Sequence, residues 1–217
     1  MAYYINLFSP ETYSAFADSN RDITGFRERH RGIAATIQPG DKLVCYMTKL
    51  SRWVGIFEVL SSCFIDDAPI FIHPQDPFIV RFQVKPTVWL RPEHAVPINQ
   101  DICWEHLSFT RGQDKKNTSW TSMVRSSLRR LEDADGAYLE ALLQQQSQAP
   151  TVFALSEMEQ RKLRLSLVNA TDRQIMVSIP EDEHTNPARG KKEQYESIQI
   201  QAKLAEIGEK MHFKIWI

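Results

Sequence analysis

Two apolar, strand-like runs separated by a short basic link constrain the fold of this 217-residue chain more than any other stretch. The runs cover residues 43–47 and 53–60, and the link between them carries Lys49 and Arg52. Gly40 and Asp41 supply a turn before the first run. Gly55 has no side chain, so another backbone or a ligand could come close to the second run at that point. Residues 40–59 therefore predict a β-hairpin.

The composition is that of a globular protein, because 42% of the residues are hydrophobic and 24% are charged. The longest apolar runs are of strand length, and the first residues show no basic segment followed by an apolar one. We therefore expect neither a membrane-spanning helix nor a signal peptide. Cys45, Cys63 and Cys103 are odd in number and lack the close spacing of zinc ligands. They are predicted to be buried thiols in a reducing compartment, which indicates a cytoplasmic protein.

The order of predicted elements is typical of a small mixed barrel with helices packed against its outside. Residues 3–7 predict a strand, and Ser9 and Pro10 predict the start of a helix that ends near Asp18. A second helix is expected over 26–37, a strand over 78–84 that resumes at 88–90, a final strand over 128–131, and a helix through 137–145 capped by Asp133 or Asp135. The predicted fold class is α+β, a small mixed β-barrel with flanking helices.

A polar, glutamine-rich stretch marks the best domain boundary. We expect one domain over 1–146, a linker over 147–155, and a short α/β segment of a second domain over 156–217. That segment predicts helices at 156–165 and 195–211 and strands at 174–179 and 213–217. Because the chain stops inside an apolar run that would leave an uncovered strand edge, we expect the second domain to be truncated.

The charge pattern indicates where a nucleic acid could bind. The net charge of −1 argues against a protein coated in positive charge. Two basic clusters stand out, one over 27–31 and one over 111–130, and phosphate contact needs several cations on one face. Each of these side chains, taken alone, is more often a solvated surface charge. The candidate phosphate-binding residues are Arg27, Arg29, Arg31, Lys49, Arg52, Arg111, Lys115, Lys116 and Arg125.

No set of residues predicts catalysis or metal binding. The six histidines lack metal-ligand spacing, the eight glycines are scattered, and no nucleophile stands beside a base. We expect no metal site, no cofactor and no catalytic residue within these 217 residues.

Three pieces of the sequence, in this order, resemble an EVE domain of the PUA-like superfamily. The chain opens with a strand followed by Phe8-Ser9-Pro10, then has Gly25-Phe26-Arg27 before a helix, and then the hairpin with Val54-Gly55-Ile56. A fourth element, Leu107-Ser108-Phe109-Thr110, precedes the last strand and helix, so the resemblance spans residues 1–146. Family members resemble the YTH readers of methylated adenine in RNA, and in bacteria they are often fused to nucleases that restrict modified DNA.

The resemblance implies an aromatic-walled pocket that holds a flipped, modified base at the mouth of the barrel. Many members carry a tryptophan where this chain has Ile23, so the stacking ring must come from elsewhere or the pocket suits a different group. Tyr46 and Trp53 lie in strand runs that favour core packing. Trp120 lies in a basic loop, where it could equally stack on a base or pack the loop against the barrel. The candidate pocket residues are Ser9, Ile23, Thr24, Phe26, Tyr46, Thr48, Trp53, Phe71 and Trp120.

The favoured hypothesis is a specificity domain that recognises a modified, flipped-out base, with DNA favoured over RNA, in a larger defence or restriction protein. The alternatives are an RNA modified-base reader, a sensor of a small molecule or nucleotide, and an enzyme of PUA-like fold. The segment after the linker faintly resembles the entry to a nuclease-like fold, whose catalytic carboxylates would lie beyond Ile217. A homodimer stays open.

Overall fold

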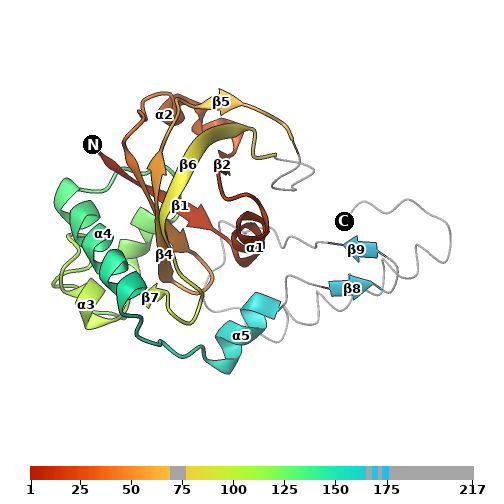
Figure 1. The fold of residues 1–217 in the computed structure, drawn as a ribbon. Helices are drawn as coiled ribbons and strands as arrows, with labels where there is room; N and C mark the ends of the chain where they lie inside the picture. Colours follow the sequence, from red (N-terminus) through yellow and green to blue (C-terminus); the bar gives the residue numbers. More distant parts are fainter. Residues whose placement is uncertain (69–76, 165–167, 171–172, 176–217) are drawn as a thin grey trace. The chain divides into compact units, whose positions relative to one another are not determined.

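The main sheet of the computed structural model is strongly curled, and its strands follow the order β1-β3-β4-β6-β2 (Figure 1). The structure describes residues 1–68, 77–164, 168–170 and 173–175. The hairpin is formed by β3 (Lys42–Met47) and β4 (Arg52–Val59), and β1 (Tyr3–Phe8) pairs in parallel with β3. On the other side, the long β6 (Val80–Trp89) pairs antiparallel with both β4 and β2 (Ile23–Phe26). The strands β1 and β2 therefore end the sheet at opposite sides.

Short elements complete the fold. The strand β5 (Phe64–Ile65) pairs with β6, and β7 (Val96–Pro97) pairs with β4. The helices are α1 (Pro10–Asp18), α2 (Arg31–Ala34), α3 (Asp101–Trp104), α4 (Asp133–Gln148) and α5 (Glu157–Arg164), with 3₁₀ turns η1 (Glu28–His30) and η2 (Ser119–Val124). A separate pair of strands, β8 (Val168–Ala170) and β9 (Arg173–Ile175), is antiparallel.

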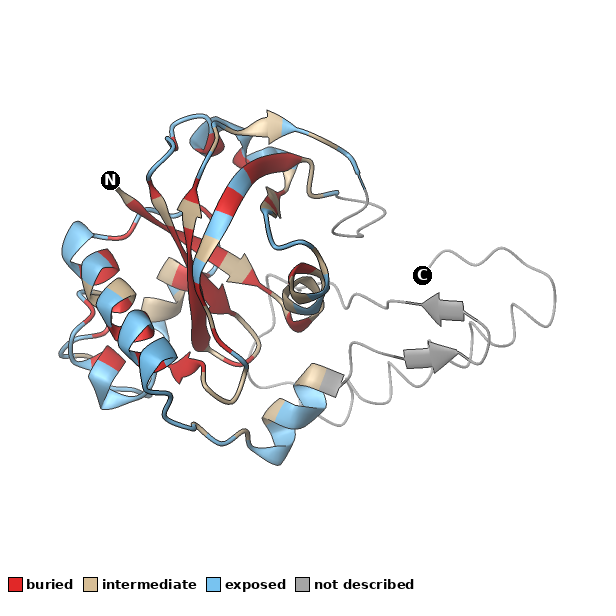
Figure 2. Ribbon diagram, viewed as in Figure 1, coloured by how far each residue is buried: buried red, intermediate tan, exposed pale blue. Residues whose placement is uncertain are grey.

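Two cores lie on the two faces of the curled sheet, and most residues of β1, β3 and β4 between them are buried (Figure 2). On β1, Tyr4 and Phe8 belong to the inner core with α1, whereas Tyr3 and Ile5 belong to the outer core with α4. This alternation follows from the two-residue period of a strand. A small mixed barrel with flanking helices was predicted, and this fold class is confirmed.

The predicted hairpin, the first strand and the first helix are present. Ser9 caps α1 through a capping box, in which its hydroxyl accepts from the Thr12 amide and its own amide donates to the Thr12 hydroxyl. Gly55 meets a neighbouring backbone, since a Cβ added there would lie 2.4 Å from the Val88 carbonyl oxygen.

Three local predictions were wrong. The helix expected over 26–37 is shorter, because Phe26 ends β2 opposite Val80 and helical geometry begins only at η1. The strand expected over 128–131 makes a single bridge to Tyr4, although its backbone bonds to β1 are formed. Glu132, and neither aspartate, is the N-cap residue of α4. The elements expected beyond residue 176 lie outside the described residues.

Candidate nucleic-acid interface

A buried polar pair joins the two end strands of the sheet on its inner face. The Asn6 side chain on β1 donates from Nδ2 to Oγ1 of Thr24 on β2 over 3.1 Å, and the two residues are 2% and 1% exposed. Asn6 also contacts Cys45, its register partner on β3, and burial raises the pKa of that thiol well above its ordinary value. The surrounding inner core is apolar, so these polar groups would be costly if they were not bonded to each other. An amide and a hydroxyl can both donate and accept, as recognition of a base edge requires. We call Asn6 and Thr24 the inner polar pair.

Two segments distant in sequence border this pair. The segment after η2 returns along β1, where the Leu128 amide donates to the Ile5 carbonyl over 2.7 Å and the Leu7 amide donates to the Ser127 hydroxyl over 3.3 Å. On the other side, β2 continues into η1, and His30 Nε2 lies 3.4 Å from the Ser126 hydroxyl. The segment that follows Thr24 and the segment around Ser127 are therefore neighbours, and each borders the inner polar pair.

Both bordering segments carry arginines. Arg27 is half-buried, with its guanidinium carbon 5.5 Å from the centre of the Phe78 ring, a distance typical of a cation–π contact. Arg29, Arg125 and Arg129 are exposed. We call these four arginines the basic rim. They place positive charge on both sides of the inner polar pair, which is the arrangement that backbone phosphates flanking one nucleotide would need.

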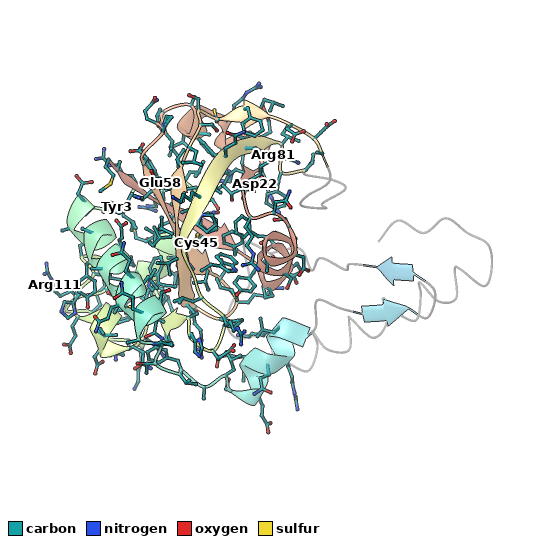
Figure 3. All side chains as sticks on the ribbon, in the orientation of Figure 1. Tyr3, Asp22, Cys45, Glu58, Arg81 and Arg111 are labelled. Carbon is teal, nitrogen blue, oxygen red and sulfur yellow. The ribbon has the colours of Figure 1, made fainter. Side chains whose placement is uncertain are left out.

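The other candidate phosphate contacts lie apart from the inner polar pair or form ion pairs with carboxylates of the domain. Arg31 pairs with Glu28 over 2.8 Å, and Lys49 pairs with Glu11 over 3.2 Å. Lys115 pairs with Asp101, the first residue of α3. Arg111 lies near α3, well apart from Arg81 at the β2–β6 side of the sheet (Figure 3). The basic stretch 111–130 is thus divided, and only its end, from Arg125, adjoins the 27–31 cluster.

Arg52 is 3% exposed, and its guanidinium bonds are directed into the domain. It bonds to Glu159 Oε1 over 3.2 and 3.1 Å, to the Phe153 carbonyl over 2.7 Å, and to the Ala154 and Pro92 carbonyls over 3.2 Å. These hydrogen bonds therefore hold residues 153–159 against the start of β4.

Most of the candidate pocket aromatics are core residues. Tyr46 and Trp53 pack edge-to-face in the outer core with ring centres 4.8 Å apart, and Phe26 packs in the inner core against Phe82. Trp120 is half-buried and packs edge-to-face on Trp104, with ring centres 5.6 Å apart.

The remaining candidates occupy varied places. Thr24 belongs to the inner polar pair, and Ile23 is half-buried beside it on β2. Ser9 caps α1, and the Thr48 hydroxyl donates to the Phe8 carbonyl over 3.3 Å. Phe71 lies outside the described residues.

Sequence reasoning missed Asn6, His30, Ser126 and Ser127, and it included Arg129 only as part of the basic cluster over 111–130. Asn6 carried a usable signal, because a polar residue between Tyr4 and Phe8 sits on the buried side of an apolar strand. Ser126 and Ser127 carried no such sequence signal, since their position depends on the return of the chain along β1. Within the described ranges, no group of three His, Cys, Asp or Glu side chains could hold a metal ion, and none of the helices is long and apolar enough to cross a membrane.

The chain is similar to known proteins in sequence and in fold. No protein-family model matches the sequence. A 158-residue stretch, 66% of this chain, is 26% identical to the whole of a UPF0310 protein of Pyrococcus abyssi. Among solved structures, the Pho92 YTH domain in complex with m6A superimposes with a TM-score of 0.50 and 13% identity, over 70% of this chain and 88% of that chain. Human THYN1 in complex with 5-methylcytosine-containing DNA gives a TM-score of 0.44 and 13% identity, over 65% of this chain and 97% of that one.

The likeness to the YTH domain shows a shared fold, a curled mixed half-barrel with flanking helices. Membership of the EVE family stays a prediction.

Proposed function

We propose that this domain binds nucleic acid and holds a modified base, flipped out of its stack, against the inner polar pair. The observation that carries the proposal is the Asn6–Thr24 hydrogen bond, a polar contact inside an apolar core between the two end strands of the sheet. Extruded bases are read by hydrogen bonds to their edges and by apolar contacts to the modification. The solved YTH domain of the same fold, whose structure contains m6A, supports this assignment.

The basic rim supports a polynucleotide ligand over a free small molecule. A sensor for a nucleoside needs no row of cations outside its pocket, whereas a strand presents a phosphate on each side of the extruded nucleotide. We place DNA ahead of RNA because the resemblance to EVE domains points to modified DNA, and RNA is the alternative that the same experiment tests.

Binding to a matched panel of oligonucleotides tests the proposal. The panel contains duplexes with unmodified cytosine, 5-methylcytosine, 5-hydroxymethylcytosine or N6-methyladenine, together with matching RNAs, and fluorescence anisotropy gives Kd at moderate salt. We expect a preference for one modified ligand that Thr24→Val and Asn6→Leu reduce roughly tenfold, about the value of one lost hydrogen bond. Thr87→Val is the matched control, since this exposed threonine of β6 makes one hydrogen bond, over 3.2 Å, to the Ile56 carbonyl.

Equal affinity of the wild type for modified and unmodified ligands would contradict the proposal. Thermal unfolding must show that Asn6→Leu and Thr24→Val are folded. If both folded variants keep the wild-type preference, the base binds elsewhere than at the inner polar pair.

We further propose that this module is the specificity domain of a larger defence protein, with a second domain after it. The support is the EVE resemblance. Cells that express the protein should then resist phage with modified DNA more than the same phage with unmodified DNA, and equal plating of both would contradict this role.

A further inference from the structure

Arg81 is a charged side chain buried beside the rim of the proposed site. It is 2% exposed and lies on β6, where it is paired with Gly25 of β2 and with Phe64 of β5. Its Nη1 donates to Asp66 Oδ2 over 2.5 Å, its Nη2 donates to the Ala68 carbonyl, and its Nε donates to the Phe78 carbonyl over 3.1 Å. The guanidinium therefore joins the chain at 66–68 to the chain at Phe78.

Burial of a guanidinium costs several kcal/mol, which good hydrogen-bond geometry must offset. A pair of apolar residues would often stabilise a fold as well, so a buried arginine is weak evidence for a purely stabilising role. The fork of donors does what an apolar side chain cannot, because it bonds at once to the Asp66 carboxylate and to the backbone carbonyls of Ala68 and Phe78, which lie on two separate stretches of chain.

One of those acceptors belongs to the residue on which Arg27 rests. The Phe78 ring lies under the Arg27 guanidinium at 5.5 Å. Arg27 follows β2 directly and stands three residues after Thr24, which is about 10 Å along an extended chain. Arg81, Phe78 and Arg27 thus form a continuous series of contacts from the buried sheet to the basic rim.

We infer that Arg81 is a positioning residue for nucleic-acid binding. By holding the Phe78 backbone, it sets the ring on which Arg27 lies, and it thereby fixes Arg27 where it neutralises a phosphate next to the extruded base. This inference rests on the proposed function. Arg81 itself does not contact the phosphate, because its guanidinium donates to the Asp66 carboxylate and to the Ala68 and Phe78 carbonyls.

The salt dependence of binding separates positioning from simple stabilisation. The variants are Arg27→Gln, Arg81→Gln, the double variant, and Phe78→Leu, which keeps Arg81 but removes the ring. Arg52→Gln is the matched control, because Arg52 is also a buried, carboxylate-paired arginine and its loss changes the net charge equally.

We expect Arg27→Gln to lower the slope of log K against log salt by about 0.9 on duplex DNA, the value for one phosphate contact. Arg81→Gln and Phe78→Leu should lower the slope in the same direction and raise Kd by up to roughly fivefold, the scale of one exposed charge contact. The double variant Arg27→Gln and Arg81→Gln should have the same slope of log K against log salt as Arg27→Gln alone. Arg52→Gln should lower the thermal unfolding midpoint and leave the slope unchanged.

Wild-type slopes in both Arg81→Gln and Phe78→Leu, with modified-base preference intact, would overturn the inference and leave the proposed function standing. Additive losses in the double variant would also overturn it, since Arg81 would then act independently of Arg27. If Arg81→Gln does not fold, Phe78→Leu still decides the question. A wild type that binds none of the oligonucleotides would contradict the proposed function, and with it this role.

Discussion

At Gly55, the sheet leaves no room for a side chain. A Cβ there would lie 2.4 Å from the Val88 carbonyl oxygen and 3.1 Å from the Trp89 ring, and both atoms belong to the neighbouring strand β6. The β4–β6 register shifts directly beside this point, between Ile56 and Phe57. The glycine lets the curled strands approach each other, which a side chain would prevent.

We therefore expect Gly55→Ala to destabilise the domain by at least about 2 kcal/mol, because backbone cannot move aside as a flexible side chain can. Urea unfolding measures the change. Gly32→Ala is the control, since in the described part of the chain no heavy atom beyond its own helix lies within 4 Å of a Cβ at that position in α2. Alanine also favours a helix over glycine by roughly 0.5–1 kcal/mol. Equal unfolding midpoints for the two variants would contradict this account of Gly55.

Buried acidic groups make the domain sensitive to high pH. Burial raises the pKa of the Cys103 thiol from 9.0 to about 12, and burial followed by the charge of Glu93 raises the pKa of the Tyr13 phenol from 10.0 to about 12. In the unfolded chain these groups lose their protons from about pH 9 and pH 10, while the folded state keeps them. Stability should therefore fall progressively between pH 9 and pH 12.

Urea midpoints measured from pH 8 to pH 11 check this expectation. Tyr13→Phe should flatten the decline, although it also removes the 2.8 Å hydrogen bond from the phenol to the Leu90 carbonyl. A midpoint that does not change up to pH 11 would show that these groups ionise equally in both states.

At the scale of elements, α5 is bound to the barrel domain by Arg52. The helix begins with a capping box, in which the Ser156 hydroxyl accepts from the Glu159 amide and the Ser156 amide donates to Glu159 Oε2. Glu159 Oε1 then pairs with Arg52 over 3.1 Å. The hydrogen bonds from Ser156 and the charge of Arg52 outweigh burial and lower the pKa of Glu159. Lys162 adds a bond to the Lys49 carbonyl over 3.1 Å.

Removal of Arg52 should release this helix. Arg52→Gln removes the guanidinium donors to Glu159 Oε1 and to the Phe153, Ala154 and Pro92 carbonyls, and breaking a buried ion pair costs about 3–5 kcal/mol. We expect trypsin to cleave after Arg161 and Lys162 many times faster in this variant, as followed by mass spectrometry. Lys116→Gln, an exposed change of equal charge, is the control. Unchanged cleavage would show that α5 is held by other contacts.

At the scale of the whole molecule, folding regroups the basic residues. The 27–31 cluster and the end of the 111–130 cluster meet through the His30–Ser126 contact, whereas Lys115 is paired at α3. The net charge of −1 hides this asymmetry. Affinity for a polynucleotide should therefore depend on a few arginines on one side of the domain.

Charge substitutions at the two ends should consequently differ. The triple variant Arg29→Gln, Arg125→Gln and Arg129→Gln is expected to lower the salt slope by up to about 2.7, or about 0.9 per phosphate contact on duplex DNA, and to weaken all sequences uniformly. The double variant Lys115→Gln and Lys116→Gln should leave the slope as it is. The reverse result would place the interface beside α3 instead of beside β2.

The sequence alone determined the scaffold, because its signals are local. Strand alternation around Gly55, the Ser9 cap and the length of the hairpin link each act within a few residues, and they predicted β1, α1, β3, β4 and the fold class. Thr24 was also predicted as a site residue. The tertiary structure decided the rest: Phe26 became a strand residue because β6 pairs with it, and Asn6 met Thr24 because the sheet curls. The basic rim likewise exists only because the chain returns along β1, a long-range contact that no local pattern records.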